Sequence, residues 1–395
     1  MFYLLIAITT RYFITMYHFL GYSNELTYND ASCKLLAPKD LHGSEDMTIG
    51  KEGLLFMTSG DLHNVFEHGS NAAKPGGIWA YNINPYTDQR WVNSPQRLPL
   101  NGFDQDLHGF HGHGFYISNE TDRLYVVNHA HAYSGIEIFH IEYNGIGRLP
   151  TLQYESTIGG AGLTFGRGTI NDVIEGGNEI NEIYVTTWLP NALPAEGKQS
   201  KAKTMSETMG LLDNLSVQLL GIKKTEVLRC VRNNKEKTWN CNSATATKFV
   251  GANGITVSPN RLKVYVNDAP MRSLSIFDRK DDGSLHLLEE IDTIDIMDNI
   301  EYLQDDTIIM GSIPKPYQYA IDREILGKTD VPVSGGAVVA SKNKETDAWV
   351  VERLVTHDGK LLSQISSAAV WGKTVFMGSP FSLGFLECSL EKGLE

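Results

Sequence analysis

The sequence lacks the features of several large protein classes. Its 34 Lys and Arg residues are outnumbered by 47 Asp and Glu residues, so the net charge is −13 and no basic excess is available to neutralise nucleic-acid phosphates. Neither a Gly-X-Y nor a heptad repeat is present, and a hydrophobic content of 42% is too high for a disordered chain. Beyond residue 21, no apolar run is long enough to cross a bilayer. What remains is a chain long enough to bury a large core, with no nucleic-acid partner.

The first 21 residues are the exception, because they are almost wholly apolar and are interrupted by Arg11 and His18. Their length fits a signal peptide or a short membrane anchor, and a buried N-terminal helix is the alternative. We therefore expect the chain to enter the secretory pathway and to be secreted, or held on the lumenal or extracellular side of a membrane. The N-terminus is then the candidate contact with a membrane or lipid surface. Whether this leader is cleaved stays open.

Cysteine is scarce, with four residues and no CxxC pair: Cys33, Cys230, Cys241 and Cys388. An even number in an exported chain favours disulfides over a zinc site. Cys33 and Cys388 lie near the two ends, and a bridge between them would tie the ends together. Cys230 and Cys241 flank a polar stretch that reads as a hairpin loop, across which a bridge is plausible. Two glycosylation sequons give weak support for export, at Asn119 and Asn214.

One short pattern recurs six times along the chain. In each copy a strand rich in β-branched and aromatic residues ends in small polar residues. The copies centre on residues 54–60, 113–129, 183–187, 253–268, 308–312 and 375–379. A repeat of roughly 45–80 residues made of antiparallel strands is typical of a β-propeller. We predict an all-β, six-bladed β-propeller over residues 22–395, with a large β-sandwich as the rival interpretation.

Two further features complete this architecture. A disulfide between Cys33 and Cys388 would close the ring by pairing the N-terminal and C-terminal strands. Residues 193–224 break the repeat and read as a polar loop followed by an amphipathic helix. We expect this insert on one face of the propeller, as a lid, a membrane contact, a partner contact or a cover over part of the fold.

Polar residues precede the same strand in five of the six repeats. They are Glu45, Asp46, His113, Asn171, Asp172, Asn253, Asp298 and Asn299. The innermost strands of a propeller all start on one face and line the tunnel, so these residues would converge on the axis. Their carboxylate and amide oxygens suit a hard cation such as Ca²⁺, and neighbouring pairs could serve two ions because adjacent side chains alternate. Asn and Asp are also common in turns, so the argument depends on their recurrence at one phase of the repeat.

Six short motifs occur in an order that identifies a family. They are GSEDMTI (43–49), HGHGFYIS (111–118), LYVVNH (124–129), INDV (170–173), ANGITVSP (252–259) and MDNI (297–300). In this order they resemble the serum paraoxonase/arylesterase family of calcium-dependent lactonases, from about Cys33 to the C-terminus. The resemblance implies a six-bladed propeller with two Ca²⁺ ions in its tunnel, one catalytic and one structural.

The resemblance also implies roles for individual residues. Those matching the catalytic calcium ligands are Glu45, Asn171, Asn253, Asp298 and Asn299, and those matching the structural calcium ligands are Asp46, Asp172 and the backbone carbonyl of Phe115. Cys33 and Cys388 match the family's disulfide. His113 and His129 match its histidine pair, with His113 as general base on a water and His129 orienting it or relaying the proton. A register in which His111 takes the part of His113 stays open.

The expected activity is calcium-dependent hydrolysis of small-molecule aryl esters and lactones, with Ca²⁺ polarising the carbonyl. One alternative is a non-catalytic, membrane-tethered or endoplasmic-reticulum chaperone of the same family. Another is a sugar-lactonase-like propeller with a single metal, which the doubled acidic and amide pairs disfavour. The strand end at Thr187–Trp188 has no acidic residue where mammalian members carry one, and Ser312 replaces a family thiol. The expected pocket rim, residues 61–71 and 193–224, does not closely match the mammalian members either. The preferred ester is therefore undetermined.

Overall fold

The computed structural model describes residues 17, 20–68, 73–84, 94–130, 134–145, 148–159, 168–177, 181–191, 205–233, 235, 238–319 and 331–393. The predicted leader, residues 1–21, lies almost wholly outside these ranges, and so does the predicted polar loop of the insert up to residue 204. Within the described ranges, no helix has both the length and the apolar character needed to span a membrane.

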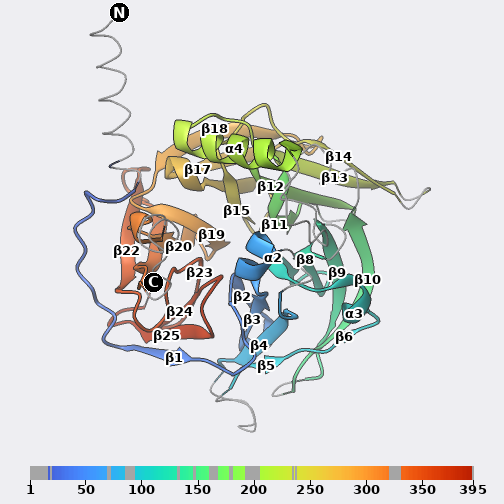
Figure 1. The fold of residues 1–395 in the computed structure, drawn as a ribbon, viewed down its shortest axis with the longest axis horizontal. Coiled ribbons are helices and arrows are strands. Elements are labelled where there is room, and N and C mark those ends of the chain that lie inside the picture. The colour runs from blue at the N-terminus through green and yellow to red at the C-terminus, as the bar shows by residue number, and fades with distance from the viewer. Residues whose placement is uncertain are drawn as a thin grey trace, which may run out of the picture.

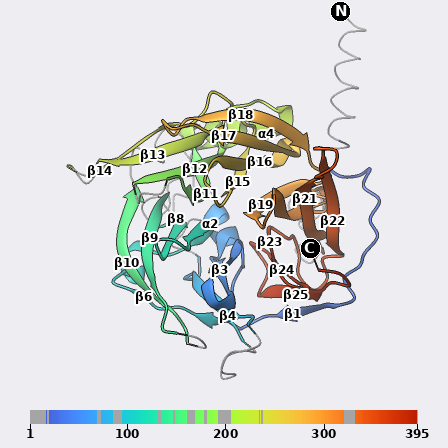
Figure 2. The ribbon, with the colours of Figure 1, turned by 180° about the vertical axis from the view of Figure 1, so that it is seen from behind.

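The strands of the described residues form six sheets arranged as a ring (Figures 1 and 2), numbered here as blades 1 to 6 from the N-terminal side. Blade 1 contains β2 (Met47–Gly50), β3 (Leu54–Ser59), β4 (Gly77–Asn82) and β5 (Gln96–Arg97). Blade 2 contains β7 (Gly112–Ser118), β8 (Arg123–His129), β9 (Ser134–Glu142) and β10 (Thr151–Gly159), with β6 (Leu100–Asn101) at its outer edge. Blade 3 contains β11 (Thr169–Glu175), β12 (Glu182–Leu189), β13 (Val227–Asn233) and β14 (Thr238–Ser243).

The remaining three blades follow the same order from the axis outward. Blade 4 contains β15 (Ala252–Val257), β16 (Lys263–Asp268), β17 (Ser273–Arg279) and β18 (Leu285–Asp292). Blade 5 contains β19 (Ile296–Tyr302), β20 (Thr307–Ile313), β21 (Gly335–Lys342) and β22 (Trp349–His357). Blade 6 contains β23 (Ser367–Trp371), β24 (Thr374–Gly378), β25 (Phe385–Ser389) and β1 (Cys33–Leu36). The described α-helices are α2 (Leu62–His68), α3 (Gln105–His108) and α4 (Met205–Leu220).

The hydrophobic core is divided among the interfaces between neighbouring blades. Phe56 of blade 1, for example, is fully buried in one cluster with Phe115 and Phe139 of blade 2. Each of the other interfaces holds a cluster of the same kind, and the innermost strands contact one another around the whole ring. The β-branched and aromatic strands of the repeat therefore bury both of their faces, as stacked sheets do. The six-bladed prediction is confirmed, and the β-sandwich interpretation is wrong.

The ring closes in blade 6, where the N-terminal strand β1 pairs with the C-terminal strand β25. Cys33 lies opposite Cys388 in this pairing, and the two are joined by a disulfide. Cys230 and Cys241 lie opposite each other in the β13–β14 hairpin and form the second disulfide. Both predicted bridges are confirmed.

The innermost strands all begin on one face of the ring, called here the upper face, and run towards the distal face. Because neighbouring strands are antiparallel, the connections after the second strand of each blade return to the upper face. Two of these connections carry α2 and α4, and Figure 1 shows both on the face turned towards the viewer. The insert predicted for this face thus supplies a helix, α4, beside the start of the innermost strands.

The two glycosylation sequons differ in accessibility. Asn119 lies exposed in the turn between β7 and β8. Asn214 lies on α4 with a side chain that is 5% exposed, and its amide bonds the backbone N–H and C=O of Asn191 (3.0 and 3.3 Å). Burial of this side chain disfavours Asn214 as an acceptor relative to Asn119. Glycosylation at the two sequons stays a prediction.

Candidate catalytic and metal site

The predicted polar residues all lie at one level of the tunnel, near the upper face. In blades 2 to 5 the ladder between the first and second strands is interrupted there, and each interruption leaves two residues unpaired. The unpaired positions are His113 and Gly114, Asn171 and Asp172, Asn253 and Gly254, and Asp298 and Asn299. In blade 1 the ladder begins only after Glu45 and Asp46. A bulge re-aims side chains towards the axis and frees their backbone groups, which is why such irregularities gather at functional sites.

Glycines at two of these bulges let neighbouring blades approach closely. A Cβ atom on Gly114 would lie 2.5 Å from Oδ1 of Asp172, and one on Gly254 would lie 2.7 Å from the carbonyl oxygen of Asp298. Both distances are shorter than any side chain tolerates, so only glycine fits. Close packing against the neighbouring blade therefore explains why glycine occupies position 114 in HGHGF and position 254 in ANGI.

Asp46 and Asp172 hold the blades together by the same pattern of hydrogen bonds. Each carboxylate accepts from the N–H of the next residue, Met47 (2.8 Å) or Val173 (2.7 Å). The other oxygen of Asp46 accepts from the N–H of Phe115 (2.9 Å), and that of Asp172 from the N–H of Ile255 (2.9 Å). Each Asp thus bridges two adjacent blades. The structure links Phe115 to the site by its N–H, and the role predicted for its carbonyl stays a prediction.

Above this pair, the remaining polar residues present oxygen atoms to one another. Nδ2 of Asn299 donates to Oε1 of Glu45 (2.7 Å) and to the Glu45 carbonyl (2.9 Å), although 254 positions separate the two residues. Asn253 hydrogen-bonds to Asp298. Four buried oxygens of this group make no hydrogen bond: Oε2 of Glu45 and the Oδ1 atoms of Asn171, Asn253 and Asn299. Buried polar atoms without a partner are costly, so a shared ligand is the ordinary explanation for such a group.

The site carries several carboxylates, and no positively charged side chain of the described residues neutralises them. Burial, followed by repulsion from Asp298 and Asp46, raises the pKa of Glu45 well above its usual value. Burial also raises the pKa of Asp46 and of Asp298 to about 7, and holds the pKa of Asp172 well above normal. Among the described residues, no Lys or Arg forms an ion pair with any of these carboxylates. Close, unpaired carboxylates of this kind are stabilised when a cation lies between them.

His113 and His129 form a connected pair at the edge of this group. Nε2 of His113 lies 3.5 Å from Oε1 of Glu45 and 3.4 Å from Nδ2 of Asn171, while its Nδ1 lies 3.0 Å from Nε2 of His129. Nδ1 of His129 in turn lies 2.9 Å from Oγ of Ser134. Burial lowers the pKa of His113 to about 3 and that of His129 well below normal, so both rings are neutral at pH 7. The contacts of His113 with Glu45 and Asn171 favour it over the alternative, His111.

His111 is also buried, and its backbone N–H donates to the side chain of Asn128 (2.8 Å). Its carbonyl accepts from the N–H of His129 (3.1 Å). His111 therefore fixes the backbone beside His129.

Comparison with known proteins agrees with this geometry. A family model described as Arylesterase matches residues 240–390, which span the last three blades and part of blade 3. Serum paraoxonase/lactonase 3 of Homo sapiens is 26% identical over 346 residues, covering 86% of this chain and 84% of that protein. The protein of the same name from Rattus norvegicus is 27% identical over 346 residues, and serum paraoxonase/arylesterase 2 of Gallus gallus is 24% identical over 348. Each of these two also covers 86% of this chain and 84% of its own length.

The resemblance to the paraoxonase/arylesterase family is confirmed. It covers 86% of the chain at about 25% identity. One rim residue does reach the site, since the ring of Trp188 lies edge-on to His113 with centroids 6.3 Å apart.

One charged residue of the tunnel was missed by the sequence analysis. Glu301 lies on β19 two positions after Asn299, and its carboxylate repels those of Asp46 and Asp172. Burial and this repulsion raise its pKa well above normal, while a hydrogen bond from Thr48 opposes the shift. Strand alternation places residues two apart on the same face, so this signal was available once the bulge was located.

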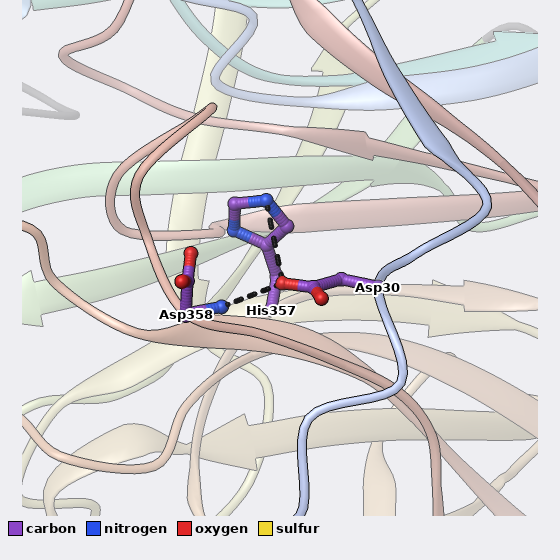
Figure 3. A group of neighbouring side chains, drawn as sticks. All are labelled: Asp30, His357 and Asp358. Atoms are coloured by element: carbon purple, nitrogen blue, oxygen red, sulfur yellow. Dashed lines mark hydrogen bonds and ion pairs between the residues drawn. The ribbon is translucent and has the colours of Figure 1, made fainter.

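A second group of side chains, outside the tunnel, contains the residue types of a metal site, but its polar atoms hydrogen-bond within the protein. Asp30, His357 and Asp358 come together where the N-terminal segment crosses the end of β22 (Figure 3). Nδ1 of His357 accepts from the N–H of Gly359 (2.9 Å), so the neutral ring carries its proton on Nε2, which faces Asp30 at 3.8 Å. The same Asp30 oxygen accepts from the N–H of Asp358 (3.0 Å).

The carboxylate of Asp358 is likewise engaged, because it pairs with Lys360 (2.5 Å). The Nδ1 lone pair that a metal would need from His357 is therefore already used, and the two carboxylates have partners within the protein. This group fastens the N-terminal segment to blade 5.

Proposed function

We propose that the chain is a calcium-dependent hydrolase of small-molecule aryl esters and lactones. The observation that carries the proposal is the set of four unpaired oxygens on Glu45, Asn171, Asn253 and Asn299. Two of these residues, Glu45 and Asn171, contact the imidazole of His113. Membership of the matched relatives in a family of lactonases and arylesterases supports the reaction class.

The residues of the tunnel fit two calcium ions. Oxygen donors from carboxylates and amides, without sulfur, are what Ca²⁺ prefers, and it accepts six to eight of them in flexible arrangements. Glu45, Asn171, Asn253, Asp298 and Asn299 would hold the catalytic ion. Asp46, Asp172 and the carbonyl of Phe115 would hold the structural ion below it. A bound calcium ion would supply positive charge to stabilise the oxyanion that develops on the substrate carbonyl.

His113 is then placed to act as the general base. The amide of Asn171 donates towards Nε2 of His113, which assigns the proton of the neutral ring to Nδ1. Nδ1–H donates to Nε2 of His129, and Nδ1–H of His129 donates to Oγ of Ser134. This chain of bonds leaves Nε2 as the acceptor nitrogen of His113, and an attacking water that displaces the long 3.4 Å contact from Asn171 would donate its proton there. His129 and Ser134 hold the ring in the required orientation and tautomer.

Two disulfides in the described residues also support an oxidising compartment, because such bridges are rare in the cytosol. We accordingly propose that the propeller works in the secretory pathway or outside the cell.

The test is hydrolysis of phenyl acetate and of a δ-lactone by the purified protein, with and without excess EDTA. We expect activity that is lost with the chelator and returns on addition of Ca²⁺. A folded protein, loaded with calcium and inactive on both substrates, would contradict the proposal and point to the non-catalytic alternative. Activity that is indifferent to EDTA would contradict the metal assignment alone.

A further inference from the structure

The tunnel has a second tier of inward-facing residues on the distal side of the proposed calcium sites. Each lies two positions after a residue of the upper tier, and alternation along the strand turns it to the same face. They include Thr48, Tyr116, Thr256 and Glu301. Glu301 is the acidic member of this tier. It accepts a hydrogen bond from Thr48, and its charge acts on Asp46 and on Asp172. It also lies close enough to Tyr116 for their charges to interact.

Two cavities lead from the distal face to this tier. One, of about 320 Å³, runs between blades 5, 6 and 1, and the other, of about 270 Å³, runs between blades 1, 2, 4 and 5. Both are lined by Thr48, Ile49, Glu301, Tyr302 and Leu303. Thr48 and Glu301 thus line both cavities and are partly exposed, whereas Asp46 and Asp172 are buried.

We propose that Glu301 is a further carboxylate of the lower calcium site, and that the ion of this site enters and leaves through the distal mouth of the tunnel. This inference rests on the proposed function, because it presupposes calcium at Asp46 and Asp172. The upper mouth leads first to Glu45 and Asp298, so an ion entering there would have to pass the upper site. From the distal side, Glu301 is the carboxylate of the cavity lining for which the described residues offer no Lys or Arg ion pair, whereas Glu120 is paired with Arg261. The oxygens of Glu301 replace water ligands before the ion reaches the two buried Asp side chains.

The chain offers a matched control within the same cavity. Glu120 lines the smaller cavity, but its carboxylate pairs with Arg261 (3.1 Å), and its side chain is 62% exposed. Exchange of either Glu for Gln removes one negative charge from the distal mouth. Only the exchange at Glu301 removes it beside Asp46 and Asp172.

The experiment measures calcium affinity by titration calorimetry and calcium release by stopped-flow mixing with a fluorescent chelator, for wild type, Glu301→Gln and Glu120→Gln. We expect two bound ions in wild type. In Glu301→Gln we expect one site to weaken by about tenfold or more with faster release, since affinity follows ligand charge, and the other to stay unchanged. Glu120→Gln should behave as wild type. If Glu301→Gln does not fold, Thr48→Val, which removes the hydrogen bond to Glu301, should produce a smaller shift in the same direction.

Several results would overturn the inference. One is a Glu301→Gln protein with wild-type affinity and release at both sites. Another is an equal change of calcium affinity and release in Glu301→Gln and Glu120→Gln. That result would mean that the net negative charge of the distal mouth matters, and that Glu301 is not a ligand. If Glu301→Gln fails to fold, wild-type calcium affinity and release in Thr48→Val would also overturn the inference. Failure of the proposed function has a different signature, because wild type itself would then bind no calcium or hydrolyse phenyl acetate equally well in EDTA.

Discussion

Nδ1 of His113 lies 3.0 Å from Nε2 of His129, and the two residues belong to neighbouring strands of blade 2. His113 sits in the bulge of β7, and His129 ends β8, where its ring also reaches Ser134. Both rings of the pair are buried. The histidines therefore depend on each other for orientation, and they should contribute unequally to turnover.

We expect His113→Gln to lower kcat for phenyl acetate by about 10²–10⁴-fold, the usual contribution of a general base, while calcium affinity is retained. His129→Gln should cause a smaller loss, because it acts on the orientation of His113. Steady-state kinetics and calcium titration check both. His140→Gln, on β9 of the same blade, is the matched control and should behave as wild type. Unchanged turnover in His113→Gln would remove this residue from the mechanism.

Asn253→Ala should weaken the catalytic calcium, because it deletes one of the four unpaired oxygens and the hydrogen bond to Asp298. A loss of about 10–100-fold in calcium affinity is expected for a disturbed metal site of this kind. Asn240→Ala, at an exposed position of β14, is the control. Equal affinities in the two variants would show that Oδ1 of Asn253 is not a ligand.

The stability of the metal-free protein should fall between about pH 6.5 and pH 8. Up to about pH 7.5 the buried histidines oppose this fall, because they are neutral in the folded chain while unfolded His, with a pKa near 6.5, still binds protons. The carboxyl groups with a raised pKa outnumber them, so a net fall is expected. The carboxyl groups of Asp46 and Asp298, with pKa raised to about 7, still bind protons in the folded state that the unfolded chain has already released. Stability therefore decreases as these protons are lost.

Calcium should reverse this trend, because it binds the ionised carboxylates and is linked to their deprotonation. At a free concentration of about 100 times Kd, a single bound ion adds about 2.7 kcal/mol to the free energy of unfolding. Calorimetric Tm values at pH 6.5 and 8, in EDTA and in excess Ca²⁺, test both parts. A metal-free Tm that rises towards pH 8 would contradict the charge assignment.

Removal of the Cys33–Cys388 disulfide should destabilise the chain more than removal of Cys230–Cys241. The first bridge joins positions 355 residues apart, and the second joins positions 11 apart. In the chain-entropy model the longer loop gives a loss of about 6 kcal/mol, above the observed range of about 0–5 kcal/mol, against about 3 kcal/mol for the hairpin. Urea unfolding of the two double Cys→Ser variants makes the comparison. The reverse order would mean that the β1–β25 pairing closes the ring without help from the bridge.

Much of the fold could be predicted from local patterns. The strands of the repeat, such as those around Tyr125 and Tyr265, show themselves by β-branched and aromatic composition between polar turns, and six such units leave few architectures available. The candidate ligands were found because they recur at one phase of the repeat. This signal depends on the order of residues along the chain alone. The prediction that Cys33 pairs with Cys388 likewise used only their positions near the two ends.

The detailed geometry could not be predicted, because it depends on contacts between distant segments. The bond from Asn299 to Glu45 spans 254 positions, and the burial of Asn214 depends on how α4 lies against Asn191. The choice between His111 and His113, and the closeness of Glu301 to Asp46, follow from where each bulge interrupts its ladder. The sequence by itself determined six apolar β-strand repeats and the chemistry of their polar ends. Only the closed ring decided which oxygens meet, since burial and repulsion act between side chains that no local pattern connects.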